Sequence, residues 1–145
     1  MTFQFLQRED VDKIVELFNE NFPDGWNKNM LLSAFDGGRF FSIGCFNNEK
    51  LIGAITCSLS IDDADIEGIT VDKTYRNKGV GQKLLKNAEQ NIKDSGITAV
   101  LLEVRQSNIP AKSLYEKAGY KQIFVRKSYY SDGENAVVMK KELQK

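Results

Sequence analysis

The chain has 145 residues, and its 20 lysines and arginines balance its 20 aspartates and glutamates, so its net charge is zero. That length predicts one domain, 1–145, which can bury a core without disulfides or metals, and the zero charge argues against a direct nucleic-acid partner. The chain has no histidine, the commonest general base and metal ligand, so we expect no metal and acid–base chemistry from Asp, Glu, Tyr, Lys or Cys.

The N-terminal segment predicts a strand and two helices. Residues 2–7 alternate as in a short strand, and the charges of Arg8, Glu9 and Asp10 do not fit a signal peptide. Asp10 is placed to cap a helix with apolar residues at helical spacing; these are Val11, Ile14, Val15 and Phe18. Phe-Pro-Asp-Gly over 22–25 breaks that helix. A shorter helix over 27–35 follows and ends at Gly37-Gly38; its expected inward side chains are Met30, Leu31 and Ala34.

Strands over 40–46 and 51–59 are expected to pair antiparallel across a short turn. In that hairpin Cys45 would lie beside Ile52 rather than Cys57, so we expect no disulfide between the two cysteines of the chain. Two unpaired thiols favour the reducing cytoplasm, and no apolar run is long enough to cross a membrane. We therefore expect a cytoplasmic protein with no membrane partner.

The remaining segments complete an alternating pattern of strands and helices. A strand over 65–71 precedes a helix over 79–93 that Gly96 terminates; the apolar stripe of this helix is Val80, Leu84, Leu85, Ala88 and Ile92. Residues 98–104 are apolar on both faces, as in the middle of a sheet. A short helix then follows; its signals are Ser107 or Asn108 as cap, Pro110 in the first turn and Gly119 at the end.

Strands over 120–128 and 135–141 end the chain. The order β-α-α-β-β-β-α-β-α-β-β predicts an α/β (α+β) fold. We expect a mixed, mostly antiparallel, seven-stranded sheet flanked on both faces by four helices.

The segment Arg-Asn-Lys-Gly-Val-Gly over 76–81 predicts an anion site between a strand and a helix. Glycines let the backbone approach a ligand closely, and the first amides of a helix lack internal partners at the positive end of its dipole. Arg76 and Lys78 add mobile charge, and the natural ligand is a phosphate or pyrophosphate. The spacing fits neither a P-loop nor a dinucleotide motif. An ordinary strand-to-helix turn explains the hexapeptide equally well.

Glu103 and Tyr115 are candidates for chemistry. A carboxylate inside an apolar strand needs a partner or water. Either Glu103 pairs with Arg105 or emerges into solvent, or the strand separates from its neighbour there and Glu103 lines a cleft. Tyr115, taken alone, is typical of a core residue whose hydroxyl reaches water.

Four stretches of the chain resemble the GCN5-related N-acetyltransferase (GNAT) family. Arg-x-x-Gly-x-Gly over 76–81 resembles its acetyl-CoA-binding segment, and Glu-Val-Arg-x-x-Asn-x-x-Ala-x-x-Leu-Tyr over 103–115 is similar to the second half of its cofactor site. The ending Arg-Lys-Ser-Tyr-Tyr-Ser-Asp-Gly-Glu-Asn-Ala-Val-Val-Met over 126–139 resembles the RimI-type subgroup. Phe-Pro-Asp-Gly-Trp-Asn over 22–27 resembles the Phe-Pro-Trp-Ser loop of that subgroup, with Asp24 and Gly25 inserted.

The resemblance implies acetyl transfer from acetyl-CoA to an α-amine, with Glu103 removing a proton from the amine. Tyr115, with an ordinary pKa, would donate a proton to the departing thiolate. Backbone amides of 69–71 would polarise the thioester carbonyl, those of 77–82 would hold the pyrophosphate, and Asn108 would contact coenzyme A. The expected cofactor-binding residues are Ile69, Thr70, Val71, Arg76, Asn77, Lys78, Gly79, Val80, Gly81, Gln82 and Asn108.

The RimI-type resemblance implies a protein N-terminus as substrate, specifically the N-terminal alanine of a small-subunit ribosomal protein. Trp26 on one side and Tyr129-Tyr130 on the other would wall the peptide cleft. Glu67 is a competing base or substrate contact, and alternation puts it on the face of Ile69, although an edge or solvent-facing position is the more ordinary explanation of this residue. The alternatives are an acetyltransferase of a small amine, served by an acidic cluster at 62–67, and a non-catalytic acyl-CoA-binding module.

Overall fold

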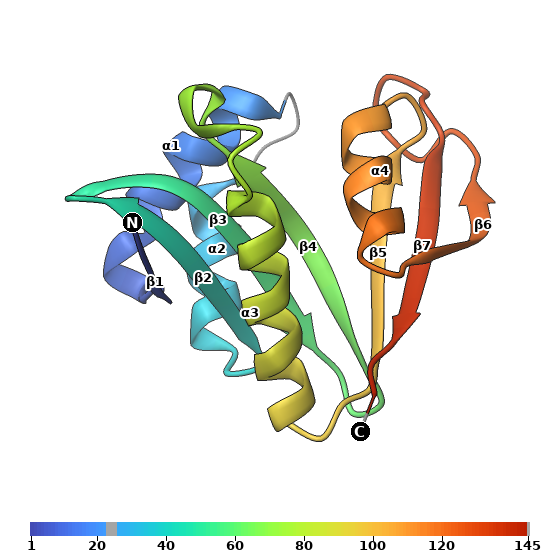
Figure 1. Ribbon diagram of the computed structural model, residues 1–145, viewed down its shortest axis with the longest axis horizontal. Coiled ribbons are helices and arrows are strands. Elements are labelled where there is room, and N and C mark those ends of the chain that lie inside the picture. Colours follow the sequence, from blue (N-terminus) through green and yellow to red (C-terminus); the bar gives the residue numbers. More distant parts are fainter. Residues whose placement is uncertain (23–25, 145) are drawn as a thin grey trace.

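A seven-stranded sheet with the strand order β1-β2-β3-β4-β5-β7-β6 organises the chain (Figure 1). The computed structural model describes residues 1–22 and 26–144, so the predicted breaker residues 23–25 lie outside the described part. The strands are β1 (Thr2–Phe5), β2 (Phe40–Asn47), β3 (Lys50–Leu59), β4 (Asp63–Val71), β5 (Ala99–Arg105), β6 (Lys121–Arg126) and β7 (Ala136–Glu142). The described helices are α1 (Val11–Asn21), α2 (Lys28–Asp36), α3 (Val80–Asp94) and α4 (Ile109–Lys117).

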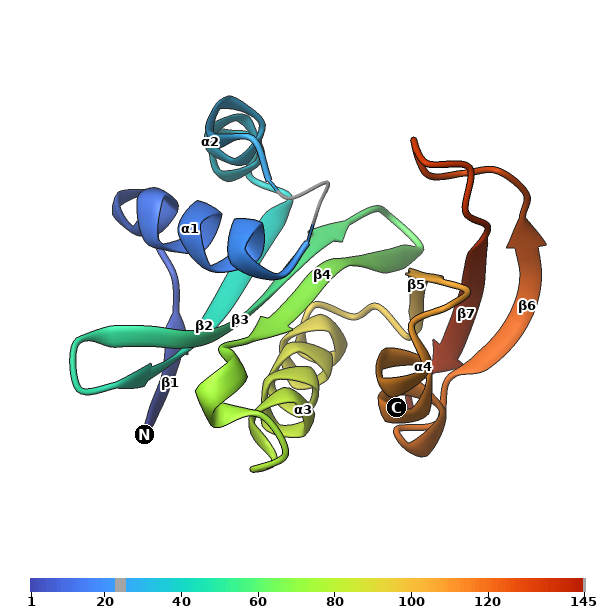
Figure 2. The ribbon, with the colours of Figure 1, turned by 90° about the horizontal axis from the view of Figure 1, so that it is seen from above.

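The described helices cover both faces of the sheet, two on each. Figure 2 shows α1 and α2 on one face of the β1–β4 half, with α3 and α4 on the opposite face. The larger core joins α3, β5, β7 and the buried Tyr115 of α4, and the smaller core packs α1 and α2 around Phe18 and Leu31. The predicted order and the helices on both faces are confirmed. No helix in the described ranges is both long enough and apolar enough to cross a membrane.

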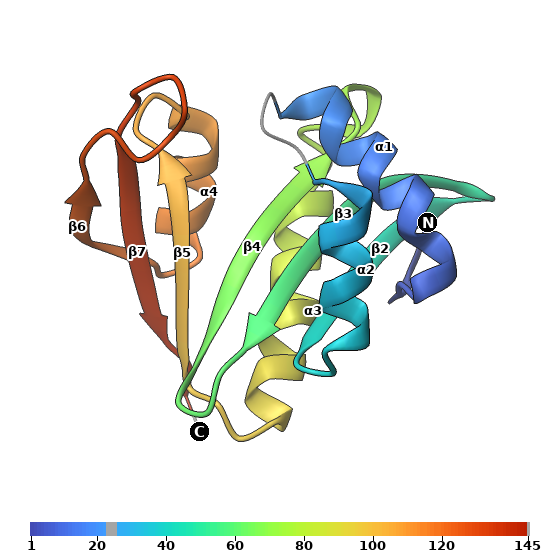
Figure 3. The same ribbon diagram turned by 180° about the vertical axis from the view of Figure 1, so that it is seen from behind.

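The parallel pairing of β4 with β5 is short. It runs from the Asp63–Ala99 pair to the Ile66–Leu102 pair, after which the two strands diverge (Figures 1 and 3). All other neighbouring strands in the sheet pair antiparallel. The divergence leaves the C-terminal ends of β4 and β5 facing one another without a sheet ladder between them.

A β-bulge in β4 lies where the divergence begins. The β3–β4 register steps from Thr56–Gly68 to Cys57–Ile66, so Glu67 is the extra residue. Ile66 and Ile69 both pack into the core under α3, although they are an odd number of residues apart. The expectation that Glu67 shares a face with Ile69 is therefore wrong, because a bulge reverses the alternation of side chains.

Three local expectations also differ from the structure. Asp10 does not cap α1 with its side chain; it ends a 3₁₀ turn (Arg8–Asp10) and accepts a hydrogen bond from the amide of Gln7 at 2.8 Å. Met30 is 63% exposed, because α2 buries a single narrow stripe around Leu31. Cys45 pairs with Gly53 rather than Ile52, because a bulge shifts the β2–β3 register; both cysteines are free, as expected.

Gly68 is where α1 comes closest to the bulged strand. A Cβ atom at this position would lie 2.8 Å from the ring of the buried Phe18. We predict that Gly68→Ala lowers the free energy of unfolding by about 1–3 kcal/mol through overpacking, measured by urea denaturation. Gly37→Ala is the control, because a Cβ there meets only ordinary contacts. Equal stability of the two variants would show that Phe18 moves aside at no cost.

Candidate active site

The loop before α3 has the geometry of an anion site. Asn77 and Gly79 adopt positive φ angles of 63° and 82°, which turn the chain sharply into the helix. The first hydrogen bond of the helix joins the Lys83 amide to the Gly79 carbonyl at 3.1 Å. In the described part of the chain, the amides of 77–82 have no backbone acceptor, so they are available to a ligand at the positive end of α3.

Arg76 is anchored rather than mobile. Its Nε donates to the Val71 carbonyl at 3.0 Å, and its Nη2 donates to the Asn21 side chain at 2.7 Å. These bonds tie the anion loop to the ends of β4 and α1, so Arg76 shapes the loop. Lys78, whose ammonium lies 5.6 Å from the Tyr75 ring centroid, is the other basic side chain that was expected here.

The open edge of β4 presents backbone groups toward the divergence. The Asp72 amide donates to Ile52 of β3 at 2.8 Å, whereas the Val71 carbonyl turns the other way and accepts from Arg76. Because backbone groups alternate along a strand, the amides of Ile69 and Val71 point away from β3, and that of Thr70 points toward it. Two of the three expected amides on this strand can thus reach a ligand between β4 and β5.

Helix α4 brings Tyr115 and Asn108 to the same side of the sheet as α3. The Asn108 Oδ1 caps α4 by accepting from the Ala111 amide at 3.2 Å. A Cβ at Gly81 would lie 3.5 Å from Leu114, so the start of α3 lies beside α4. Tyr115 is 5% exposed, and burial raises its pKa instead of leaving it ordinary, so the phenol is fully protonated at neutral pH.

A polar network that the sequence did not indicate packs behind Tyr115. The Tyr120 ring meets the Tyr115 ring edge-on, with centroids 5.8 Å apart. The Tyr120 hydroxyl donates to Glu89 Oε2 at 2.8 Å, and the Lys141 ammonium donates to Glu89 Oε1 at 3.0 Å. This network joins α3 to β7. In the sequence, Glu89 lies at the edge of the apolar stripe of α3, a position at which a carboxylate is ordinarily expected to face solvent.

Glu103 follows directly after the last β5 residue that pairs with β4. Its carboxylate lies 3.7 Å from the Arg126 guanidinium, and its side chain is 32% exposed. The strand pairing shows that β5 separates from β4 at Glu103, which is one of the alternatives that the sequence left open. Arg105 forms ion pairs with Asp132 and Glu134 at 2.8 and 3.0 Å.

Tyr129 and Tyr130 lie beside Glu103. A hydrogen bond to Glu103 and the charge of that carboxylate raise the pKa of Tyr129. Burial and the same charge raise the pKa of Tyr130 to about 12, and the Arg105 guanidinium lies 4.1 Å from its ring centroid. Both phenols are therefore neutral at physiological pH, and Tyr129, which is 52% exposed, is the more accessible ring.

Glu67 lies on the same face of the sheet as Glu103. Its Oε1 accepts a hydrogen bond from the Ser58 hydroxyl at 2.5 Å. Burial raises the pKa of Asp65, and the charges of Glu67, Asp63 and Glu103 raise it further. The carboxylates of β4 and β5 thus act on one another across the divergence.

Ser58 was missed by the sequence reasoning. One pattern in the sequence could have predicted it: Thr56 and Ser58 alternate with Cys57 and Leu59, which indicates a polar stripe on one face of β3. In the described part of the chain, Thr56 Oγ1 is the one fully buried side-chain polar atom without a hydrogen-bond partner. The polar stripe therefore continues under α1 and α2.

Trp26 packs against Phe40, with ring centroids 6.2 Å apart at 71°. It belongs to the smaller core, on the face of the sheet that α1 and α2 cover. The inserted residues Asp24 and Gly25 lie outside the described part. No ring contact joins Trp26 to the Tyr129–Tyr130 pair within the described ranges, and a cleft gripped between them stays a prediction.

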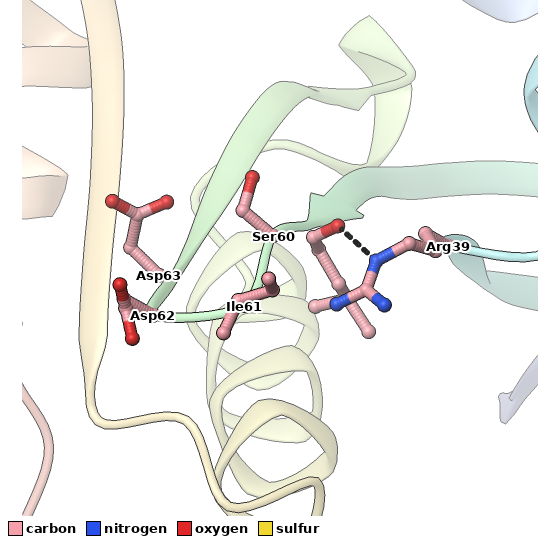
Figure 4. A pocket seen from close by; sticks show the side chains of 6 residues that line it. Arg39, Ser60, Ile61, Asp62 and Asp63 are labelled. Carbon is pink, nitrogen blue, oxygen red and sulfur yellow. Dashed lines mark hydrogen bonds between the residues drawn. The ribbon is translucent and has the colours of Figure 1, made fainter.

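Two surface hollows lie away from these groups. The larger, of about 620 Å³, is at the β3–β4 turn, where Arg39 donates to the Leu59 carbonyl on one side and Asp62 and Asp63 lie on the other (Figure 4). The smaller, of about 310 Å³, lies between β1 and the outer face of α3. Neither hollow is lined by residues 77–82, Tyr115 or Glu103. No cluster of three or more metal-ligating side chains occurs within the described residues.

The comparisons with known proteins agree with this geometry. The sequence matches the Acetyltransferase (GNAT) family over residues 11–120. The chain belongs to this family and is an N-acetyltransferase. The resemblance seen in its motifs is thereby confirmed.

Two relatives and one solved structure show which members of the family this chain is similar to. A ribosomal protein bS18-alanine N-acetyltransferase of Haemophilus influenzae is 34% identical over 134 residues, 90% of this chain and 90% of that protein. The enzyme of the same name from Haemophilus ducreyi is 32% identical over 135 residues, 90% of this chain and 92% of that protein. The crystal structure of the ribosomal-protein-S18-alanine N-acetyltransferase from Escherichia coli superposes with a TM-score of 0.90 at 26% identity, covering 99% of this chain and 94% of that one.

Proposed function

We propose that this enzyme transfers an acetyl group from acetyl-CoA to the N-terminal alanine of a small-subunit ribosomal protein. The similarity to the bS18-alanine N-acetyltransferases over 90% of the chain carries this proposal. The chain supplies a fitting site for the donor, because the amides of 77–82 suit a pyrophosphate and those of Ile69 and Val71 suit a thioester carbonyl. Asn108, whose Oδ1 caps α4, keeps its amide nitrogen for a contact with coenzyme A.

The chemistry of an N-terminus suits a carboxylate base. An α-amino group has a pKa of about 7.7–8.0, against about 10.4 for lysine, so a modest base suffices. Glu103 takes a proton from the ammonium group and passes it to water, and the freed amine nitrogen forms a bond to the acetyl carbon as the carbon–sulfur bond breaks. Tyr115, which burial keeps protonated at the start, gives its proton to the departing thiolate. The nitrogen of the new amide loses its second proton to Glu103, and water carries that proton to the Tyr115 phenolate, so the products are the acetylated amine, the free thiol and one proton.

The peptide substrate approaches from the face of the sheet that lies opposite α3 and α4. Glu67, Glu103, Tyr129 and Tyr130 lie on this face, and the donor-binding amides and Tyr115 belong to the side of α3 and α4. The early end of the β4–β5 pairing is the passage between them. In this proposal Glu67 contacts the ammonium group and the tyrosines contact the following peptide.

A small cationic amine is the second candidate. The acidic strip of Asp63, Asp65 and Glu67, whose charges act on one another, would suit such a substrate. We expect thiol release and acetylation with an alanine-initiated ribosomal peptide and none with its N-terminally blocked copy, a polyamine or an aminoglycoside. Preference for the small amine would replace the proposed substrate. A chain that binds acetyl-CoA but releases no thiol with any amine would be a binding module.

Variants of the two carboxylates separate their roles. We predict that Glu103→Gln lowers kcat on the alanine-initiated peptide about 10²–10⁴-fold, because it removes the base. Glu67→Gln should mainly raise the peptide KM. Steady-state kinetics at saturating acetyl-CoA measure both effects. A large kcat loss confined to Glu67→Gln would assign the base to Glu67.

Gly81 provides a charge test of the donor site. A side chain at this position meets Leu114 at an ordinary distance, so both Gly81→Glu and Gly81→Gln should fold. Glu favours the helix N-terminus but repels a pyrophosphate, so we predict a Kd for acetyl-CoA at least about tenfold higher for Glu than for Gln, with no loss of thermal stability. Isothermal titration measures the affinities. Equal Kd values would place the pyrophosphate elsewhere.

A further inference from the structure

The hydrogen bond from Ser58 to Glu67 crosses from β3 to the bulge of β4. Ser58 is paired in register with Asp65, and Glu67 is the bulged residue that the β3 ladder skips. The hydroxyl oxygen nevertheless reaches Glu67 Oε1 at 2.5 Å, a short distance typical of a hydroxyl donating to an ionised carboxylate. A side-chain bond thus takes the place of the missing cross-strand pairing at Glu67.

The surroundings of Glu67 make that bond consequential. Asp65 of the same strand, Cys57 of β3 and Tyr129 of the β6–β7 connection interact electrostatically with Glu67, and Glu103 of β5 interacts with Asp65 and Tyr129. Arg126, a cation on this face, is paired with Glu103 at 3.7 Å. Glu67 is held instead by the hydroxyl of Ser58.

We propose that Ser58 is a positioning residue, whose hydroxyl holds the Glu67 carboxylate on the face that carries Glu103 and Tyr129, ready to receive the substrate's α-ammonium group. This inference rests on the proposed function. The two glutamates then have different roles: Glu67, held by Ser58, binds the charged amine, and Glu103 removes the proton. The bulge places Glu67 at the divergence, and Ser58 determines where its carboxylate lies.

The test compares Ser58→Ala with Ser58→Thr and with a neighbour outside the site. Ser58→Ala should raise the peptide KM about tenfold, since it removes a hydrogen bond to a charged group. Because Glu103 still removes the proton, kcat should change little. Ser58→Thr keeps the hydroxyl and should restore the peptide KM. Ser60→Ala, in the exposed β3–β4 turn, should match the wild type in KM and kcat.

Further measurements on these variants separate a positioning role of Ser58 from a structural one. The acetyl-CoA Kd and the thermal midpoint should be unchanged in Ser58→Ala, which separates positioning from folding and donor binding. A wild-type peptide KM in Ser58→Ala would overturn the proposal, as would an equal rise of KM in Ser58→Ala and Ser58→Thr. If the wild-type enzyme acetylates no N-terminal peptide, the proposed function itself fails, and the role of Ser58 fails with it.

Discussion

The early end of the parallel pairing between β4 and β5 is the constraint on which the site depends. Backbone donors and acceptors in a sheet normally satisfy one another, and a strand that leaves its neighbour must find other partners. Here the bulge at Glu67 begins the separation, and the amides of Ile69 and Val71 are left facing outward. A ligand that lies along β4 can accept the hydrogen bonds that β5 does not accept there. Binding therefore uses hydrogen-bonding capacity that folding leaves unused.

The divergence also divides the chemistry between the two faces of the sheet. Helices α3 and α4 hold the free amides and the buried Tyr115 on one face, whereas the carboxylates of Glu67 and Glu103 lie on the other with Tyr129. In the proposed reaction, a neutral proton donor and a carboxylate base need different environments, because burial favours the neutral form of a group and water or hydrogen bonds favour the charged one. Separate faces provide both environments within one small protein.

The site is held in place by contacts that lie outside it. Arg76 ties the anion loop to the last residues of α1 and β4. Glu89 accepts hydrogen bonds from Tyr120 and Lys141, which joins α3 to β7 across the two halves of the sheet. Because the loop of residues 77–82 leads into α3 and Tyr120 packs on Tyr115, this network fixes the proposed donor-binding loop relative to Tyr115. Rigidity of this kind is what positioning a reaction requires.

The helices and strands, their order and the ends of α3 and α4 could be predicted from the sequence. The apolar spacing from Val80 to Ile92 and the capping side chain of Asn108 act between near neighbours in the chain, so α3 and α4 appeared within a few residues of their predicted bounds. The tertiary structure alone decided the bulge at Glu67, the exposure of Met30 and the bond from Ser58. Those features depend on register and packing between segments distant in the sequence, and a shift of one residue between strands reverses which face each side chain occupies.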